Sequence, residues 1–157
     1  MIEKKGVRIL CDVARDLTDL DFIFVGDGPE REYLINATKI NSNIKFIGRI
    51  DNRFLNRYYN CADVFCISSQ YEEGFGRVVM EAVACGLLVV GSNKGGIPEA
   101  LDESVSILVE PSKENLKKAI EDLYKDQNRY LELKKNCRKY AEKNFSEENI
   151  NLITRYY

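Results

Sequence analysis

The chain has 157 residues, among them 23 Lys and Arg and 25 Asp and Glu, and its formal net charge is −2. This length fits a single domain, residues 1–157, and the near balance of charges argues against nucleic acid as a partner. No apolar segment approaches the roughly 20 residues that cross a bilayer, and no signal-peptide pattern opens the sequence, so we expect a cytoplasmic protein without a transmembrane segment.

Short apolar segments alternate with helical patterns along the chain. The strand-like segments are rich in β-branched and aromatic residues and comprise residues 22–25, 44–47, 64–67, 87–90 and 106–109. The helical patterns comprise residues 6–17, 29–40, 52–62, 76–86 and 97–101. This alternation is typical of parallel βαβ units, so the sequence predicts an α/β fold with a doubly wound parallel sheet and helices on both faces.

The last part of the chain has helical patterns without strands between them. Residues 112–126 and 127–143 have helical patterns, and a further one covers residues 146–157. Ser112 and Ser146 stand at the first positions of two of these segments, where a hydroxyl side chain caps a helix N-terminus. We therefore expect C-terminal helices over residues 112–157.

Small and polar residues follow four of the five predicted strands. The segments that follow them are VGDGP (25–29), IGRID (47–51), ISSQYEEGFG (67–76) and VVGSNKGG (89–96). In open parallel sheets, ligands bind beyond the carboxyl ends of the strands, where helix N-termini present free N–H groups. One edge of the predicted sheet is therefore expected to bind a ligand with anionic groups.

The sequence offers few groups for metal or redox chemistry. Histidine is absent, and the five cysteines have neither metal-type nor C-x-x-C spacing, so we interpret them as reduced core residues. An Asp-x-Asp pair occurs at Asp19 and Asp21, but it precedes the first strand, at the end of the sheet opposite the ligand edge. We interpret this pair as a solvated turn and expect no metal cofactor.

One carboxylate interrupts an apolar helical segment. Residues 78–85 read VVMEAVAC, so Glu81 is the one charged residue in what we predict to be a buried helix. An unpaired buried charge costs several kcal/mol, so Glu81 is expected either to pair with Arg77, four residues earlier, or to face the ligand edge and bind vicinal hydroxyls. Glu73 lies in the glycine-flanked loop just before the helix.

These residues resemble a known enzyme family. Glu73 and Glu81 stand eight residues apart around Gly74-Phe75-Gly76, and GGIPE follows at 95–99. This pattern resembles that of the retaining glycosyltransferases of family 4, which have the GT-B fold of two facing Rossmann-like domains. Further similar segments are EKKG (3–6), VGDGPE (25–30), NIKFIGRI (43–50), ADVF (62–65) and FSEENI (145–150). The resemblance covers nearly the whole chain and implies the C-terminal, donor-binding half of such an enzyme.

The resemblance assigns roles to individual residues. It implies that Glu73 sits beside the transferred sugar and that Lys5 neutralises the diphosphate leaving group, as the two catalytic residues. It implies that Glu81 holds the ribose hydroxyls and that residues 48–50 line the base pocket. The donor-binding residues are then Glu81, Phe75, Gly76, Arg77, Gly48, Arg49 and Ile50.

The resemblance also implies the reaction and its partners. The donor is a nucleotide-diphosphate sugar, and its glycosyl group is transferred with retention of anomeric configuration, without a metal ion. The acceptor is held by an N-terminal domain, which we expect on a separate chain or in a longer polypeptide. Polysaccharide biosynthesis is a common role in this family, and the resemblance leaves peripheral membrane association open.

One strand of the family pattern is not found. The donor-binding half of these enzymes opens with a strand that ends in Gly-Arg, whose Arg shares the pyrophosphate with the Lys. Neither the strand nor the Arg precedes Lys5. We therefore expect an N-terminally truncated half that is inactive by itself. Because the first strand is central in a doubly wound sheet, its loss is expected to leave a gap in the middle.

Two other functions remain open from the sequence. The first is a non-catalytic nucleotide-sugar-binding module or a truncated remnant, which would keep Glu81 without transferring sugar. The second is a relative with the same fold and different chemistry, such as a nucleotide-sugar epimerase. The absence of histidine and the spacing of Glu73 and Glu81 argue against the second.

Overall fold

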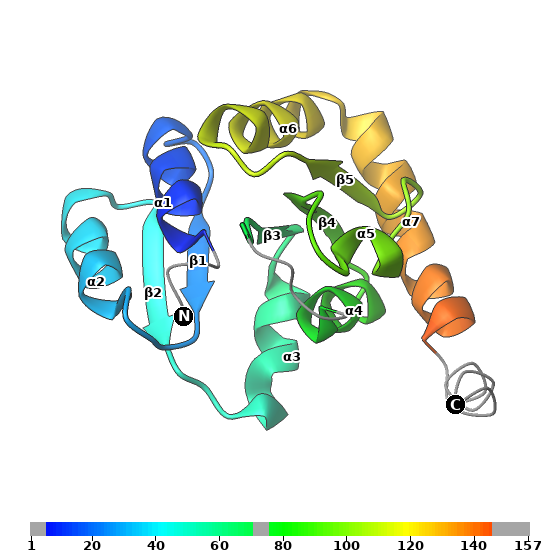
Figure 1. Cartoon of the computed structure of the whole chain (residues 1–157), viewed down its shortest axis with the longest axis horizontal. Coiled ribbons are helices and arrows are strands. Elements are labelled where there is room, and N and C mark those ends of the chain that lie inside the picture. Colours follow the sequence, from blue (N-terminus) through cyan, green and yellow to red (C-terminus); the bar gives the residue numbers. More distant parts are fainter. Residues whose placement is uncertain (1–5, 71–75, 146–157) are drawn as a thin grey trace.

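The computed structural model describes residues 6–70 and 76–145. Helices and strands alternate along this part of the chain, followed by two consecutive helices (Figure 1). The elements are α1 (Val7–Asp16), β1 (Phe22–Val25), α2 (Arg31–Ile40), β2 (Ile44–Gly48), α3 (Asn52–Cys61), β3 (Val64–Ile67), α4 (Arg77–Ala84), β4 (Leu88–Ser92), α5 (Ile97–Ala100), β5 (Ser106–Val109), α6 (Lys113–Lys125) and α7 (Gln127–Asn144).

Every strand pair in the described part of the chain is parallel. β1 pairs with β2, and β4 lies between β3 and β5. Consecutive strands are joined by helices, as parallel pairing requires. The predicted α/β class and its parallel strands are therefore confirmed.

The described strands form two separate sheets. One contains β1 and β2, and the other contains β3, β4 and β5; over residues 6–70 and 76–145 no strand connects β1 with β3. Figure 1 shows the two sheets on either side of the molecule. This arrangement agrees with the expected gap in the middle of the sheet. Residues 1–5 lie outside the described part of the chain.

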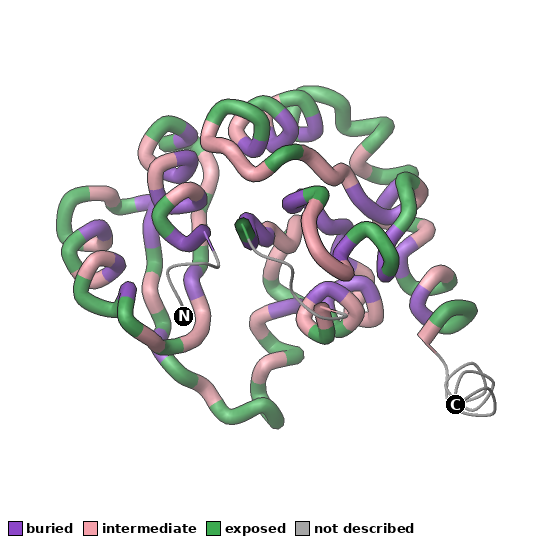
Figure 2. The backbone as a smooth tube through the Cα atoms, viewed as in Figure 1, coloured by how far each residue is buried: buried purple, intermediate pink, exposed green. Residues whose placement is uncertain are grey.

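The core centres on β4. Each of its five residues is buried, because α6 packs against β4 and β5 while α4 and α7 also pack against β4 (Figure 2). β3, by contrast, is half-buried at Val64, Phe65 and Cys66. The central strands of a parallel sheet are normally covered on both faces, whereas three of the four residues of β3 are only half-buried. This burial is that of an edge strand, which agrees with the position of β3 at one end of its sheet.

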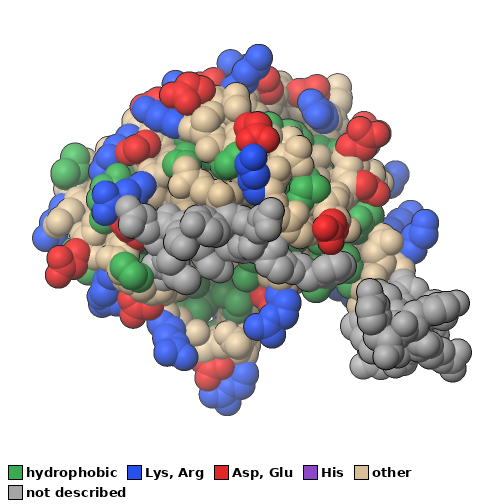
Figure 3. Space-filling view, in the orientation of Figure 1, with side chains coloured by type: hydrophobic (Ala, Val, Ile, Leu, Met, Phe, Trp, Pro, Cys, Tyr) green, Lys and Arg blue, Asp and Glu red, His purple; other side chains and the backbone are tan. Residues whose placement is uncertain are grey.

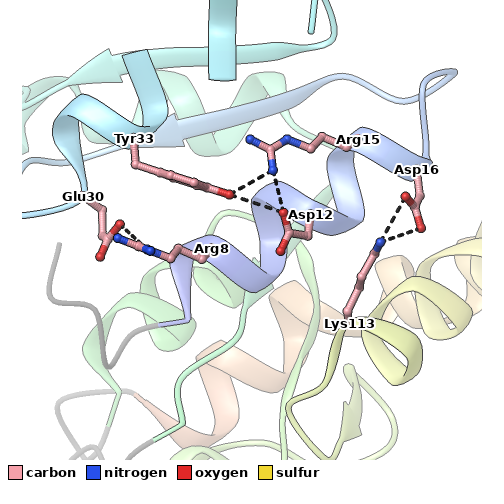
Figure 4. Close-up of polar contacts among 7 residues, drawn as sticks. All are labelled: Arg8, Asp12, Arg15, Asp16, Glu30, Tyr33 and Lys113. Atoms are coloured by element: carbon pink, nitrogen blue, oxygen red, sulfur yellow. Dashed lines mark hydrogen bonds and ion pairs between the residues drawn. The ribbon is translucent and has the colours of Figure 1, made fainter. Parts of the chain in front are cut away.

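Helix α1 connects the two sheets. It packs against α6 and also contacts β2. At its carboxyl end, Asp16 forms an ion pair with Lys113 of α6 at 3.1 Å (Figure 4). It forms a second one with Lys117, also on α6, at 3.4 Å. These pairs lie at the surface, so the apolar contact between the helices contributes most of the stability.

Element bounds agree with the sequence predictions in most places. β1, β3 and β5 have the predicted ranges, whereas β4 begins one residue later than predicted and extends to Ser92. It extends because Gly91 and Ser92 continue the pairing with Leu108 and Val109. Ser112 caps α6, as predicted, by accepting a hydrogen bond from the N–H of Asn115. The helix predicted over residues 146–157 lies outside the described residues.

Surface charges are mixed in sign. Figure 3 shows Lys and Arg side chains interspersed with Asp and Glu over the visible face. The net charge of −2 agrees with the mixed charges on this face. Among the helices that the structure describes, none combines the length and apolarity that a membrane span needs.

Candidate ligand site at the carboxyl edge

The N-terminus of α1 lies at the carboxyl ends of strands from both sheets. The carbonyl oxygen of Gly6 accepts a hydrogen bond of 2.7 Å from the hydroxyl of Ser68, which directly follows β3. Gly6 has φ +65°, and a Cβ at this position would collide with the carbonyl oxygen of Ser68. Glycine is therefore required for the close approach between α1 and β3.

A second contact connects α1 to the loop after β1. Arg8 donates from Nε to Oε2 of Glu30 at 2.8 Å (Figure 4). Glu30 is buried and stands at the N-cap position of α2. A buried carboxylate needs such a partner, so this pair fixes the loop after β1 against the first turn of α1.

Two helices begin at left-handed glycines without side-chain caps. They are α1, after Gly6 with φ +65°, and α4, after Gly76 with φ +50°. The first N–H groups of a helix have no intrahelical partner, and the helix dipole gives this end a partial positive charge. Both helix N-termini are therefore suited to an anionic ligand such as a diphosphate.

Glu81 is exposed, which corrects the prediction of a fully buried helix. α4 buries Val79, Ala82 and Val83, while Arg77 and Glu81 are exposed. The described part of the chain covers one face of α4 and leaves the face with Arg77 and Glu81 exposed. The apolar sequence alone did not predict this exposed face. The expected alternative of an ion pair with Arg77 is not observed between these two described residues.

The carboxylate of Glu81 interacts with a tyrosine of another helix. The hydroxyl of Tyr59, near the end of α3, donates to Oε2 of Glu81 at 3.1 Å. Tyr59 is 8% exposed, and its ring meets that of Phe65 edge-on, with centroids 5.8 Å apart. Tyr59 was not predicted from the sequence, because 22 residues separate it from Glu81 and no local pattern connects them.

The predicted base-binding residues follow β2. Gly48 is the last residue of β2 and has φ +78°, and the strand bulges where Phe24 pairs with Phe46 and Val25 with Gly48. Such a bulge redirects the chain that follows it. Arg49 and Ile50 then line an open pocket of about 510 Å³ together with Asp51 and Asn52.

The structure places only some of the predicted site residues. Gly48, Arg49 and Ile50 lie at the start of the segment that leads into α3, and Gly76, Arg77 and Glu81 lie on or next to α4. Gly48, Arg49 and Ile50 lead into α3, and Tyr59 of α3 contacts Glu81 of α4. The hydrogen bond between Tyr59 and Glu81 thus connects the two sets of site residues. Lys5, Glu73 and Phe75 lie outside the described residues, so their predicted roles remain predictions.

Buried hydroxyls at the same edge were not singled out from the sequence. Ser69 follows β3, and Ser92 ends β4; both are fully buried. Neither hydroxyl has a hydrogen-bond partner within the described residues. Unsatisfied buried hydroxyls are uncommon in folded proteins, and these two lie where parallel sheets bind ligands.

The Asp-x-Asp pair and the cysteines do not contribute to this edge. Asp21 precedes β1 and pairs with Lys45 at 2.9 Å on the surface. Cys11 and Cys137 are buried as predicted, and burial raises the pKa of the Cys137 thiol to about 11. Cys61 is exposed, so its interpretation as a core residue was wrong; it lies on the outward face of α3.

The Tyr59 hydroxyl predicts an alkaline loss of stability. Burial, and next the charge of Glu81, raise the pKa of Tyr59 above its ordinary value. The unfolded chain releases this proton above about pH 10, while the folded chain retains it. The stabilisation of the folded chain by the protonated Tyr59 hydroxyl is therefore complete below about pH 10. Above that pH, the free energy of unfolding falls by up to about 1.4 kcal/mol per pH unit.

Denaturant titrations of the wild type and Tyr59→Phe between about pH 8 and about pH 11 measure this loss. Phenylalanine has no proton to release, so the wild type should lose stability relative to the variant as the pH rises. Parallel stability curves over that range would contradict the assignment.

Parallel strands, glycine-started helix N-termini at their carboxyl ends and an exposed carboxylate on one of these helices define this chain as a Rossmann-like domain. Its family follows from the match of residues 1–144 to the model described as Glycosyl transferases group 1. The chain belongs to this family.

Solved structures show the same fold. The chain superposes with a TM-score of 0.83 and 25% identity on Alr3699/HepE from Anabaena in complex with UDP, covering 99% of this chain and 45% of that one. It superposes with a TM-score of 0.82 and 28% identity on sucrose-phosphate synthase from Thermosynechococcus elongatus, covering 99% and 42%. The predicted half of a GT-B fold is confirmed.

Curated relatives are longer than this chain. Spore coat protein SA from Bacillus subtilis is 30% identical over 97% of this chain and 45% of its own length. The 2-deoxystreptamine N-acetyl-D-glucosaminyltransferase of Niallia circulans is 34% identical over 59% of this chain and 25% of its own length. The chain therefore spans less than half the length of these relatives.

Proposed function

We propose that this chain binds a nucleotide-diphosphate sugar and forms the donor-binding part of a retaining glycosyltransferase. The observation that carries the proposal is the exposed carboxylate of Glu81 on a helix whose N-terminus is uncapped. The carboxylate suits the vicinal hydroxyls of a ribose, and the helix N-terminus suits the diphosphate. The complex of Alr3699/HepE with UDP supports this choice of ligand.

The proposed chemistry requires positive groups around the leaving diphosphate. Cleavage of the anomeric C–O bond produces an oxocarbenium-like sugar and a nucleoside diphosphate, so preorganised donors near the phosphates lower the barrier. The first N–H groups of α4 are such donors, and Lys5 is proposed as the cation. Glu73 is proposed to contact the transferred sugar.

The acceptor is proposed to bind to a further domain. Because the relatives have more than twice the length that this chain covers, a second domain on the same or another polypeptide is expected to hold the acceptor. We therefore expect donor binding without sugar transfer when residues 1–157 are prepared by themselves.

Calorimetric titration with UDP, GDP and their sugars tests the proposal. The protein is first shown to be folded by a cooperative thermal transition, and the titration is performed in EDTA and again with Mg²⁺. Binding of one nucleotide in EDTA is the expected result. A folded sample that binds neither nucleotide would refute the donor site, and binding that requires Mg²⁺ would refute the metal-free reaction.

A further inference from the structure

The tyrosine that contacts Glu81 is held rigidly. Tyr59 belongs to a small cluster with Ala82 of α4 and Leu87, the residue before β4. Phe65 of β3 packs edge-on against its ring, with the ring planes 62° apart. Since the ring contacts α4 and the second sheet, its hydroxyl has a fixed position relative to α4.

The carboxylate of Glu81 needs such a partner. An exposed glutamate rotates about three side-chain bonds, and ordering it on ligand binding costs conformational entropy. The hydroxyl of Tyr59 contacts Oε2 at 3.1 Å, while Oε1 has no hydrogen bond to any described residue. One oxygen thus accepts from Tyr59, and none of residues 6–70 or 76–145 occupies the other, which a ligand hydroxyl could reach.

The hydroxyl remains a donor at ordinary pH. Burial and the adjacent carboxylate raise the pKa of Tyr59, so the hydroxyl keeps its proton. Arg77, which lies on the same helix as Glu81, forms no ion pair with that carboxylate in the described part of the chain. Among the described residues, the hydrogen bond from Tyr59 is therefore the side-chain contact that orients Glu81.

Helix α3 also connects Glu81 to the pocket. α3 begins at Asn52 after a cap by Asp51, whose side chain accepts from the N–H of Arg53. Asp51 and Asn52 line the pocket beside Arg49 and Ile50, and Tyr59 lies near the other end of the same helix. One rigid helix thus fixes both the pocket and the carboxylate.

We infer that Tyr59 is a positioning residue for ribose recognition: its hydroxyl holds the Glu81 carboxylate in the rotamer that accepts the ribose hydroxyls. This inference rests on the proposed donor site. A role in packing alone predicts a different result, because it would change the affinity for every nucleotide alike and would lower the melting temperature.

The test compares a ribonucleotide with its 2′-deoxy form. UDP or GDP, whichever binds the wild type, and the matching 2′-deoxynucleotide are titrated into the wild type, Tyr59→Phe, Glu81→Ala and the double variant. Tyr58→Phe is the matched control, since it removes the hydroxyl of the neighbouring tyrosine on the same helix. Melting temperatures show which variants remain folded.

Tyr59→Phe is expected to lose roughly 10-fold in affinity for the ribonucleotide, which corresponds to about 1.4 kcal/mol. Its affinity for the 2′-deoxynucleotide should change little. Tyr58→Phe should match the wild type. In the Glu81→Ala background, Tyr59→Phe should have no further effect, because it acts through that carboxylate.

Two results would overturn the inference while leaving the donor site intact: unchanged ribonucleotide affinity in Tyr59→Phe, or an equal loss for both nucleotides. A folded wild type that binds neither UDP nor GDP would instead overturn the donor site and this inference together. If Tyr59→Phe fails to fold, Tyr59→Met replaces it, because methionine is apolar, fills irregular space and has no donor for the Glu81 carboxylate. The same selective loss for the ribonucleotide is expected in Tyr59→Met. An equal loss for both nucleotides, or no loss, would overturn the inference.

Discussion

Replacement of Glu81 by alanine is expected to reduce nucleoside diphosphate affinity by roughly 10- to 100-fold, because a hydrogen bond to a charged group contributes about 1.5–3 kcal/mol. Glu81 is exposed on α4, so its removal creates no cavity. Calorimetric titration of the wild type and the variant with UDP or GDP measures the change. The loss should be much smaller for the 2′-deoxynucleotide.

The controls separate ribose binding from stability. Glu81→Ala leaves the buried Tyr59 hydroxyl without its acceptor, which costs about 1 kcal/mol and lowers the melting temperature by about 2–4 °C. Glu132→Ala removes an exposed glutamate from α7 and should leave both affinity and stability unchanged. Equal affinities in the wild type and Glu81→Ala would refute the ribose role of Glu81.

A strand supplied ahead of α1 is expected to join the two sheets and stabilise the domain. In a right-handed βαβ unit, the strand that precedes a helix lies next to and parallel with the strand that follows it. α1 leads into β1, so its preceding strand would lie beside β1, on the side facing β3. Ile23 is 42% exposed and most of β3 is half-buried, so apolar surface is available there.

The experiment adds a short apolar segment to the N-terminus. About five valine and leucine residues with a flexible linker precede Met1, and the matched control carries proline at the centre, which cannot pair inside a sheet. The net gain after ordering the new strand is expected to be on the order of 2 kcal/mol, which raises the melting temperature by about 5 °C.

Hydrogen exchange then identifies the site of the gain. Amides of β1 and β3 should exchange more slowly in the extended protein, while those of β5 should change little, because β5 borders β4 at the far side of its sheet. Equal melting temperatures for the extension and its proline control would contradict the predicted position of the strand.

Local sequence patterns predicted the helices and strands because interactions between residues close in the sequence determine where they begin and end. The ranges 22–25, 64–67 and 106–109 match β1, β3 and β5, since runs of β-branched and aromatic residues between polar segments form buried strands. Ser112 caps α6 because its hydroxyl satisfies a free N–H group within the same turn. The family signature around Glu81 likewise lies in one continuous segment.

Burial and long-range contacts required the tertiary structure. The apolar residues around Glu81 predicted a buried helix, but burial depends on which elements cover each face, and one face of α4 is open. The ion pair with Arg77, one of two alternatives that the sequence left open, is not formed in the described part of the chain, and Glu81 accepts a hydrogen bond from Tyr59, 22 residues away.

Residue types at short spacing were enough to predict the α/β class and the family, because each depends on neighbours along the chain, while the ligand edge stays a prediction. The gap between the two sheets was expected from the family resemblance, whereas the contact between Tyr59 and Glu81 became visible only in the folded chain. Strand pairing and side-chain contacts join segments far apart in the sequence, and the free energy of such pairs depends on the packing of the whole domain.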